Sequence, residues 1–404
     1  MRNYEYGEMK KYDFIVIGAG IFGVTTAVEL AKKKFQVAVL NPDSIPHPRA
    51  ASTDISKVVR MEYGPDREYA DMCERSIEVW KEWNELFQET LYHEVGLLIA
   101  MKEALEAPSQ TYARQNIATL EAKGYKLQYL DTATLKERFP AWNTEVYPRA
   151  IFNPCAGYAE AGRAVGKLAE YAQQLGVHIF EGQTAERFLT KNHVLEAVQT
   201  KEGETYACGH AIVCAGAHTP YLLPELHPYM KSTGHAIYHL LPSDPTLFSP
   251  PNFSVYMADV SNTGWYGFPF HQREGVVKAG HHSDGLAIHP DRDDRVIKDQ
   301  EIDHFRSFLK ATFPDLVDAP ITYTRRCLYT DTKDGHFWID QHPEMTGLTI
   351  GTGGSGHGFK MGPELGKMIA ATALGQQHAY SDRYKWREFS TATRNMEASR
   401  HQSE

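Results

Sequence analysis

Cysteine is scarce in this sequence: there are five among 404 residues, with no CxxC pair and no regular spacing. This pattern argues against a disulfide framework and a zinc ribbon, and it suits a reducing cytoplasm best. The 19 histidines include no HExxH motif and no Cys/His quartet with ligand spacing. We therefore expect a cytoplasmic protein without a metal site.

Long apolar runs and an excess of positive charge are missing as well. The longest apolar stretch, residues 14–28, is interrupted by three glycines and two threonines and is too short to span a bilayer. Residues 1–11 are polar and charged, unlike the apolar core of a signal peptide. The formal net charge is −9, whereas binding to nucleic acid needs a basic surface. The expected partner is therefore a small molecule, and neither a membrane nor a nucleic acid.

The composition is that of a globular protein, with 42% hydrophobic and 23% charged residues, and the length suggests two or three domains. Residues 13–17 are a short β-branched and aromatic run that predicts a buried parallel strand. Helical periodicity follows over residues 22–33, and residues 36–40 predict a second strand. A strand, a glycine-rich turn, a helix and a second strand within about thirty residues are typical of half a dinucleotide-binding domain.

The turn has the sequence Gly18-Ala19-Gly20-Ile21-Phe22-Gly23, a GxGxxG motif. The first glycine permits the tight turn, the second lets a pyrophosphate approach the backbone, and the third allows close packing of helix on strand. The second strand of such units usually ends in an acidic residue that binds the ribose, but here Asn41 follows it. Asp43 lies two residues on, so the sequence leaves open which of the two takes the ribose.

The rest of the chain mixes helical and strand patterns. Prolines, tyrosines and short alternating runs between residues 220 and 324 suggest an antiparallel sheet. The last twenty or so residues have the composition of a polar surface tail. Helices are predicted at 68–87, 109–124, 132–138, 161–175 and 363–374, and strands at 177–181, 210–214, 255–257, 264–270, 276–281 and 348–350.

Five segments together resemble one family: GAGIFG at 18–23, DISKVVR at 54–60, YGFP at 266–269 with Lys278 downstream, RCLYTDT at 326–332 and GGSGHGFK at 353–360. They are similar to the amine oxidases typified by monomeric sarcosine oxidase, in the D-amino-acid oxidase-like superfamily. Pipecolate oxidase and the deglycating fructosyl-amino-acid oxidases are close to this group. The resemblance spans nearly the whole chain.

The resemblance implies an α/β fold. In it, a Rossmann-type FAD-binding domain is interleaved with a substrate domain that has a mixed, largely antiparallel β-sheet and helices. We expect the FAD-binding domain at 12–85, 148–220 and 325–385 and the substrate domain at 86–147 and 221–324. Residues 1–11 and 386–404 remain as polar tails.

The same resemblance implies FAD as cofactor and a set of residues that bind it. Arg325 and Arg326 precede Cys327, and cationic neighbours favour the nucleophilic thiolate. In the family the cysteine at this place forms a thioether to the flavin 8α-methyl carbon, so Cys327 is the expected covalent anchor. The other four cysteines are expected to be structural. The FAD-binding residues implied are Gly18, Ala19, Gly20, Ile21, Phe22, Gly23, Asn41, Ser52, Ala185, Gly216, Cys327, Gly354, Ser355, Gly356, His357, Gly358 and Lys360.

The residues implied for substrate and oxygen form a second set. Strand alternation places Lys278, Gly280 and His282 on one face, and the family has matching Lys and His residues beside the flavin, where the lysine activates oxygen. Arg60 and Lys360 match positions that hold the substrate carboxylate. Lys57 matches a basic residue near the flavin, but it shares a side with Arg60 only in a helical turn and not in a strand. The expected catalytic residues are Lys278, His282, Arg60, Lys360, Tyr266, Tyr329 and Lys57.

We therefore expect an FAD-dependent oxidase of amino acids with a secondary amine, of the N-methyl or cyclic imino acid type and with a free carboxylate. A hydride equivalent would pass from the C–H next to nitrogen to flavin N5, the imine would be hydrolysed, and O₂ would be reduced to H₂O₂. One alternative is a deglycating fructosyl-amino-acid oxidase, although those enzymes usually have a tryptophan after the cysteine, where this chain has Leu328. Two others are a dehydrogenase with another electron acceptor and a nucleotide-binding regulatory protein. A monomer or small homo-oligomer is expected.

Overall fold

The computed structural model describes residues 11–391, 393, 395, 397, 399 and 400. The chain divides into two compact units. Unit 1 comprises Met1–Asp54, Ala161–Lys231 and Tyr329–Asn395, and unit 2 comprises Ile55–Glu160, Ser232–Leu328 and Met396–Glu404. The boundaries at 231/232 and 328/329 fall within strands β13 (Met230–Leu240) and β18 (Ile321–Thr332).

Unit 1 is built on one eight-stranded sheet with a parallel centre. Its strands run in the order β10-β11-β12-β1-β2-β9, with β20 beside β12 and β19 beside β20. The pairs β1–β12, β1–β2, β2–β9 and β12–β20 are parallel. Every residue of β2 is buried, as expected for a central parallel strand covered on both faces. The strands are β1 Lys11–Ile17, β2 Val37–Asn41, β9 His178–Glu181, β10 Ala185–Lys191, β11 Val194–Thr200, β12 Thr205–Val213, β19 Trp338–Gln341 and β20 Leu348–Thr352.

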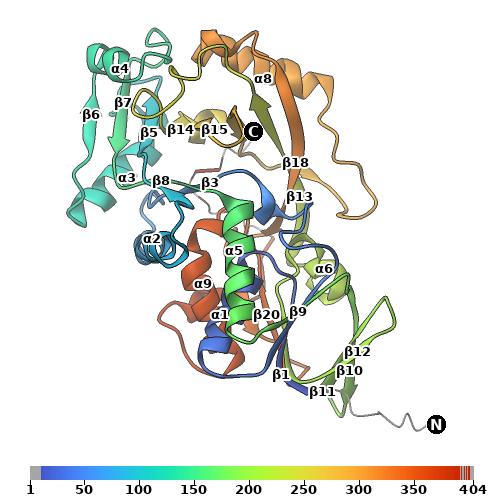
Figure 1. The fold of residues 1–404 in the computed structure, drawn as a ribbon. Helices are drawn as coiled ribbons and strands as arrows, with labels where there is room; N and C mark the ends of the chain where they lie inside the picture. The colour runs from blue at the N-terminus through green and yellow to red at the C-terminus, as the bar shows by residue number, and fades with distance from the viewer. Residues whose placement is uncertain (1–10, 392, 394, 396, 398, 401–404) are drawn as a thin grey trace. The chain divides into compact units, whose positions relative to one another are not determined.

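Helices α1, α5 and α9 lie side by side in unit 1 (Figure 1). The contact between α1 and α9 depends on two glycines one turn apart. A Cβ at Gly362 would lie 2.4 Å from Ile21 Cγ1, and one at Gly366 would lie 2.5 Å from Thr25 Cβ. The two helices therefore approach each other more closely than any larger residue would permit. The helices of unit 1 are α1 Ile21–Lys32, α5 Ala161–Gln174, α6 Thr219–Leu222 and α9 Gly362–Ala373.

Unit 2 contains a nine-stranded, largely antiparallel sheet and a small three-stranded sheet. The large sheet runs in the order β17-β13-β16-β15-β14-β5-β7-β6, with β18 beside β13, and the small one runs β3-β8-β4. Its helices are α2 Arg67–Phe87, α3 Thr111–Ala122, α4 Thr132–Arg138, α7 Val260–Thr263 and α8 Asp299–Thr312. Its other strands are β3 Lys57–Val59, β4 Tyr92–His93, β5 Leu97–Met101, β6 Gln128–Leu130, β7 Arg149–Asn153, β8 Gly157–Ala159, β14 Val255–Ala258, β15 Trp265–His271, β16 Val276–His281 and β17 Leu286–Ala287.

An aromatic and aliphatic core lies beneath the large sheet of unit 2. Trp142 makes edge-on contacts with Tyr256 and Phe313, with ring centroids 5.5 and 4.7 Å apart. Trp265 stacks on Phe308 with ring centroids 4.6 Å apart. Pairs in these geometries stabilise a core beyond the area that they bury. This packing fixes the position of the sheet and therefore of the polar side chains that project from it.

The unit boundaries differ from the domain bounds expected from the sequence. Residues 55–85 lie in unit 2, although the sequence placed them in the FAD-binding domain. The reason is strand pairing, because β3 pairs with β8 of the small sheet and α2 follows β3 in the chain. Residues 325–328 likewise belong to unit 2.

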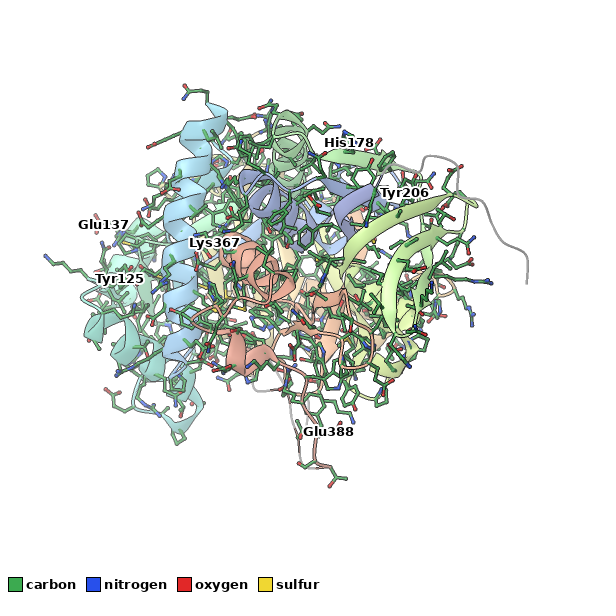
Figure 2. All side chains as sticks on the ribbon, turned by 90° about the horizontal axis from the view of Figure 1, so that it is seen from below. Tyr125, Glu137, His178, Tyr206, Lys367 and Glu388 are labelled. Carbon is green, nitrogen blue, oxygen red and sulfur yellow. The ribbon has the colours of Figure 1, made fainter. Side chains whose placement is uncertain are left out.

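The segment after α9 also differs from the expected polar tail. Trp386 donates its backbone N–H to Asp340 Oδ2 at 2.8 Å, and its ring lies edge-on to Trp338. The Arg387 guanidinium pairs with Asp334 at 2.7 Å. Glu388, labelled in Figure 2, accepts a hydrogen bond from a tyrosine hydroxyl of unit 1. These contacts join residues with no helical or strand periodicity, which is why the sequence pattern missed them. Of the tail expected at 1–11, residues 1–10 lie outside the described residues, and Lys11 begins β1.

Within the part of the chain that the structure describes, no helix combines the length and the apolar character needed to cross a membrane. Among the same residues, no group of three or more His, Cys, Asp or Glu side chains is arranged to hold a metal ion.

Candidate active site

The glycine turn between β1 and α1 can form only with its glycines in place. Gly18 has φ +97°, and a Cβ there would lie 2.5 Å from Cys214 O. A Cβ at Gly23 would lie 1.8 Å from Gly18 O. At Gly20, in contrast, the nearest atom to such a Cβ is Ser52 Oγ at 3.4 Å. Two glycines therefore serve close packing and the middle one leaves the backbone open, as the motif predicts.

The N-terminus of α1 is suited to an anion. Its first turn has no acidic residue, and its N-cap, Gly20, supplies no side chain. The N–H groups of the first turn and the helix dipole together favour a negatively charged group there. Ser52 lies beside this terminus, since Ile21 N donates to Ser52 Oγ at 3.1 Å.

Asn41 is occupied within the chain. Its Oδ1 accepts a hydrogen bond from Ala19 N at 3.1 Å, and its Nδ2 donates to Asp43 O at 2.7 Å. The residue is buried and ties the end of β2 to the glycine turn. This role requires an amide, because a carboxylate could accept from Ala19 but could not donate to Asp43.

A second glycine-rich loop lies against the first in unit 1. A Cβ at Gly354 would lie 3.7 Å from Phe22 Cζ, and one at Gly358 would lie 2.7 Å from the same atom. Gly356 has φ +78° and faces Tyr329, whose Cε2 would be 2.5 Å from a Cβ there. The fold thus brings together two glycine loops that are more than three hundred residues apart in the sequence.

Hydrogen bonds hold this second loop in shape. Ser355 has φ +42°, and its Oγ accepts from Thr332 N at 3.3 Å. His357 Nε2 lies 2.9 Å from Gly335 O, and Lys360 Nζ donates to His357 O at 2.8 Å. Lys360 is buried. It belongs to unit 1 whereas Arg60 belongs to unit 2, so their joint action on one carboxylate stays a prediction.

The two positions expected near the adenine half lie at the ends of unit 1 strands. Ala185 is the first residue of β10. Gly216 follows β12 with φ +53°, and a Cβ there would meet no heavy atom within 4 Å. Gly216 therefore presents open backbone, whereas Ala185 shows no feature that marks it as a binding residue.

In unit 2, strands β15 and β16 place two of the expected catalytic residues, Tyr266 and Lys278, on one face. Tyr266 pairs with Gly280, and Phe268 pairs with Lys278. The absence of a side chain at Gly280 leaves room for Tyr266, whose hydroxyl would be 2.7 Å from a Cβ there. His282 follows β16 and donates its backbone N–H to Gly264 O at 2.7 Å. The alternation expected from the sequence therefore holds for Lys278 and Gly280, whereas His282 lies just beyond the strand.

Lys278 is a buried cation with defined contacts. It is 1% exposed, its Nζ donates to Ser56 O at 2.5 Å, and it lies 4.4 Å from the centroid of the Phe268 ring. A cation over an aromatic face is attracted by the ring quadrupole, and this attraction is larger away from water. Because an ammonium is expensive to bury, a position of this kind is typical of a functional group.

Strand β3 contains Lys57 but not Arg60. Lys57–Val59 form a strand and not a helical turn, and Arg60 follows directly after that strand. Lys57 Nζ lies 3.6 Å from Cys327 Sγ, and Arg60 is buried elsewhere in the unit. The cation beside the thiol is therefore Lys57. Arg326, which the sequence suggested for that role, pairs with Glu301 at 2.5 Å.

Three other cysteines behave as structural residues. Burial raises the pKa of the Cys208 thiol and of the Cys214 thiol to about 12. Burial also raises the pKa of Cys155. A thiol with a raised pKa is a poor nucleophile, so these groups are inert at neutral pH. All five cysteines are free.

Arg60 is only 4% exposed and is engaged by the end of the chain. Its Nη2 donates to Ser399 Oγ at 2.9 Å and lies 3.6 Å from Glu397 Oε1. Glu397 Oε2 in turn lies 2.9 Å from His282 Nε2. Because a carboxylate only accepts hydrogen bonds, Nε2 carries the proton. Within the described residues, the buried Arg60 Nη1 has no hydrogen-bond partner.

The charges around this cluster shift its pKa values. Burial disfavours charge on Arg60, but nearby acidic groups, Glu397 and Glu62 among them, raise its pKa above the ordinary value. Burial lowers the pKa of His282, and the hydrogen bond to Glu397 opposes this shift only in part. Arg60 is therefore always charged, and His282 is neutral at neutral pH.

The sequence matches a model of the FAD-dependent oxidoreductase family over residues 13–372. The chain belongs to this family. The glycine turn, the bare N-terminus of α1 and the second glycine loop fit an FAD, because they offer open backbone to a pyrophosphate and its neighbours. The family assignment also excludes the alternative of a nucleotide-binding regulatory protein that carries out no reaction.

Several curated relatives of this oxidoreductase are amine oxidases. It is 27% identical to a monomeric sarcosine oxidase from Bacillus sp. (strain B-0618), covering 90% of this chain and 92% of the relative. It is 26% identical to an L-saccharopine oxidase from Schizosaccharomyces pombe, covering 93% of each chain. The human peroxisomal sarcosine oxidase is 28% identical, covering 89% of this chain and 91% of the relative.

Solved structures confirm the fold of the oxidoreductase. Amadoriase I from Aspergillus fumigatus superposes with a TM-score of 0.82 at 23% identity, covering 97% of this chain and 94% of that one. An L-proline dehydrogenase from P. horikoshii superposes with a TM-score of 0.81 at 22% identity, covering 93% and 97%. The expected α/β fold with an FAD-binding part and a mixed, largely antiparallel sheet is thereby confirmed.

The sequence missed three residues of the site. Glu397 and Ser399 lie in a segment without periodicity or motif, so no local signal could have identified them. Ser56 contributes its carbonyl oxygen to Lys278, and any residue could supply that group.

Proposed function

We propose that this oxidoreductase oxidises amino acids that carry a secondary amine and a free carboxylate, with O₂ as electron acceptor. The observation that carries the proposal is the buried Arg60, which is charged, already lies beside a carboxylate and keeps Nη1 without a partner in the described chain. A planar guanidinium matches a carboxylate in two parallel hydrogen bonds. The names of the relatives, among them sarcosine and saccharopine oxidases, support the same substrate class.

Arg60 and Lys360 have the role of binding and orienting the substrate. We assign the substrate carboxylate to Arg60, with Lys360 as the second cation, so that the amine-bearing carbon has one orientation. Fixed orientation of the reacting groups contributes a large part of enzymatic rate enhancement. Tyr266 lies on the same sheet face as Lys278, and we assign it, with Tyr329, to the pocket wall. His282 is neutral at neutral pH and its Nε2 donates to Glu397, so we assign its other ring nitrogen as a proton acceptor.

FAD, when bound, accepts a hydride equivalent from the C–H next to nitrogen and passes electrons on to O₂. We assign its pyrophosphate to Gly20 and Ser52, and its pyrimidine end to the loop of Gly354 to Gly358. Asn41 holds the turn from within, so we assign the ribose to Asp43. Lys278 supplies a fixed positive charge that stabilises the negative charge developing on reduced oxygen.

We further propose that Cys327 anchors the flavin covalently. The support is geometric: its Sγ lies 3.6 Å from the Nζ of Lys57. In the wild type, yellow colour should remain with the protein after acid precipitation, and Cys327→Ser should release it. Cys208→Ser is the matched control and should retain the colour. Flavin recovered free from the wild type would contradict the anchor.

The substrate class is tested by peroxide release from N-methyl, cyclic and fructosyl amino acids. We expect turnover of the N-methyl or the cyclic amino acids. For Arg60→Met, kcat/KM should be about 100-fold lower, because the substrate carboxylate would lose the guanidinium that binds it. Lys32→Met, on the surface of α1, is the control. Turnover of fructosyl substrates alone would favour the deglycating alternative, and reduction of a dye without consumption of O₂ would favour a dehydrogenase.

The location and assembly expected from the sequence stay proposals. The free thiols support a reducing compartment, so we propose the cytoplasm. A monomer or a small homo-oligomer remains the expected assembly, and sedimentation velocity would measure it.

A further inference from the structure

The last described residues of the chain are buried in unit 2. Glu397 is 6% exposed, Ser399 is 2% exposed and Arg400 is 5% exposed. Ser399 Oγ donates to Glu397 at 2.7 Å and accepts from Arg60 at 2.9 Å. The carboxylate of Glu397 therefore lies at the guanidinium that we assign to the substrate.

The contact between Glu397 and Arg60 is incomplete. Glu397 Oε1 is 3.6 Å from Nη2, which is beyond hydrogen-bond distance, and the other nitrogen, Nη1, has no hydrogen-bond partner in the described chain. A carboxylate that faces both nitrogens of an arginine forms two short hydrogen bonds, and such a pair is more stable than one with a single long contact. A carboxylate that bonded both nitrogens would thus satisfy Arg60 better than Glu397 does.

Side-chain contacts join the described residues of this segment to unit 2. Residues 397, 399 and 400 lie in no helix or strand, and Glu397 contacts His282 while Ser399 contacts Arg60. Displacement of Glu397 would replace one carboxylate at Arg60 by another and would break the hydrogen bond between Glu397 and His282.

We propose that Glu397 is a specificity-determining residue, an internal carboxylate that a substrate must displace from Arg60. While Glu397 is in place it neutralises the guanidinium and weakens its attraction for other anions. Amines without a carboxylate cannot compete for Arg60 and leave Glu397 bound. This inference rests on the assignment of Arg60 to the substrate carboxylate.

Binding of acetate to the flavin-loaded enzyme tests the inference without turnover. Isothermal titration calorimetry with acetate, and with neutral acetamide as control ligand, should show about tenfold tighter acetate binding to Glu397→Gln than to wild type. Acetamide binding should be unchanged. Glu388→Gln, an exposed acidic residue of the preceding segment (Figure 2), is the matched control and should bind acetate as wild type does.

A second variant, Ser399→Ala, keeps the inference testable if Glu397→Gln does not fold. Ser399→Ala removes the hydroxyl that joins Arg60 to Glu397, and acetate binding should tighten by a smaller factor. With amino acid substrates, Glu397→Gln should lower KM, because the competition between the two carboxylates precedes the reaction.

The outcomes separate this inference from the proposed function. Acetate that binds the wild type and binds Glu397→Gln no more tightly would overturn the inference alone and make Glu397 a positioning residue for Arg60. Acetate that binds neither protein would overturn both the inference and the assignment of Arg60. Tighter binding to both variants supports the inference even if no amino acid is oxidised.

Discussion

The close packing at Gly23 predicts a loss of stability that can be separated from a loss of cofactor. In Gly23→Ala, the new Cβ would lie 1.8 Å from Gly18 O, about 1.6 Å short of the 3.4 Å at which ordinary contact begins. Gly18 O is a backbone atom and the new Cβ is fixed to the backbone of α1, so neither can rotate away. The whole helix α1 must therefore move away from the turn. Nine residues of α1 are buried, and they would lose packing when it moves.

The size of the effect follows from two opposing terms. Overpacking of a core costs about 1–3 kcal/mol and occasionally more, and a contact between two backbone segments belongs at the upper end. Alanine is better than glycine in a helix by about 1 kcal/mol. We expect a net loss of at least about 2 kcal/mol, which lowers the melting temperature of a unit of this size by roughly 4–8 °C.

Gly20→Ala is the matched control. A Cβ there would meet only Ser52 Oγ, at 3.4 Å, so the protein should fold normally but lose the open backbone that a pyrophosphate needs. Melting curves by circular dichroism on protein made under riboflavin starvation measure stability, and the flavin-to-protein absorbance ratio of normally grown protein measures cofactor binding. Gly23→Ala should lower both quantities, and Gly20→Ala only the ratio. A flavin-free Gly23→Ala protein that melts within 1 °C of wild type would refute the reasoning.

Two further predictions concern oxygen and pH. Lys278→Met keeps the side-chain volume and removes the charge, so stopped-flow reoxidation should slow about 100-fold while reduction by substrate changes far less; equal slowing of both steps would mean that the lysine has another role. Burial lowers the pKa of His210 from 6.5 to about 4. The neutral form therefore stabilises the fold fully above pH 6.5, and up to about 3 kcal/mol of the free energy of unfolding is lost as the pH falls toward 4. Between pH 7 and pH 5, the free energy of unfolding measured with urea should fall by about 2 kcal/mol more for wild type than for His210→Gln. The exposed control His227→Gln should follow wild type. Identical pH profiles for wild type and His210→Gln would contradict the lowered pKa of His210.

Local patterns in the sequence determined much of the fold and part of the site. The run from β1 through the glycine turn to α1 follows from strand propensity, turn glycines and helical periodicity over some twenty residues. The same kind of pattern placed Lys278 and Gly280 on one face of β16, since side chains alternate, although His282 lies beyond the end of that strand. These features depend only on residues that are close together in the sequence, so the sequence alone can predict them.

Only the tertiary structure decided the contacts between distant segments. Pairing of β3 with β8 made residues 57–59 a strand, in which Lys57 lies beside Cys327, and Arg60, just after the strand, contacts Ser399. Residues 397 and 399, in a polar stretch without periodicity, reach Arg60 through the carboxylate of Glu397 and the hydroxyl of Ser399. Such contacts depend on which surfaces complement each other after folding. Arg60 could therefore be recognised from the sequence, but the carboxylate that lies beside it could not.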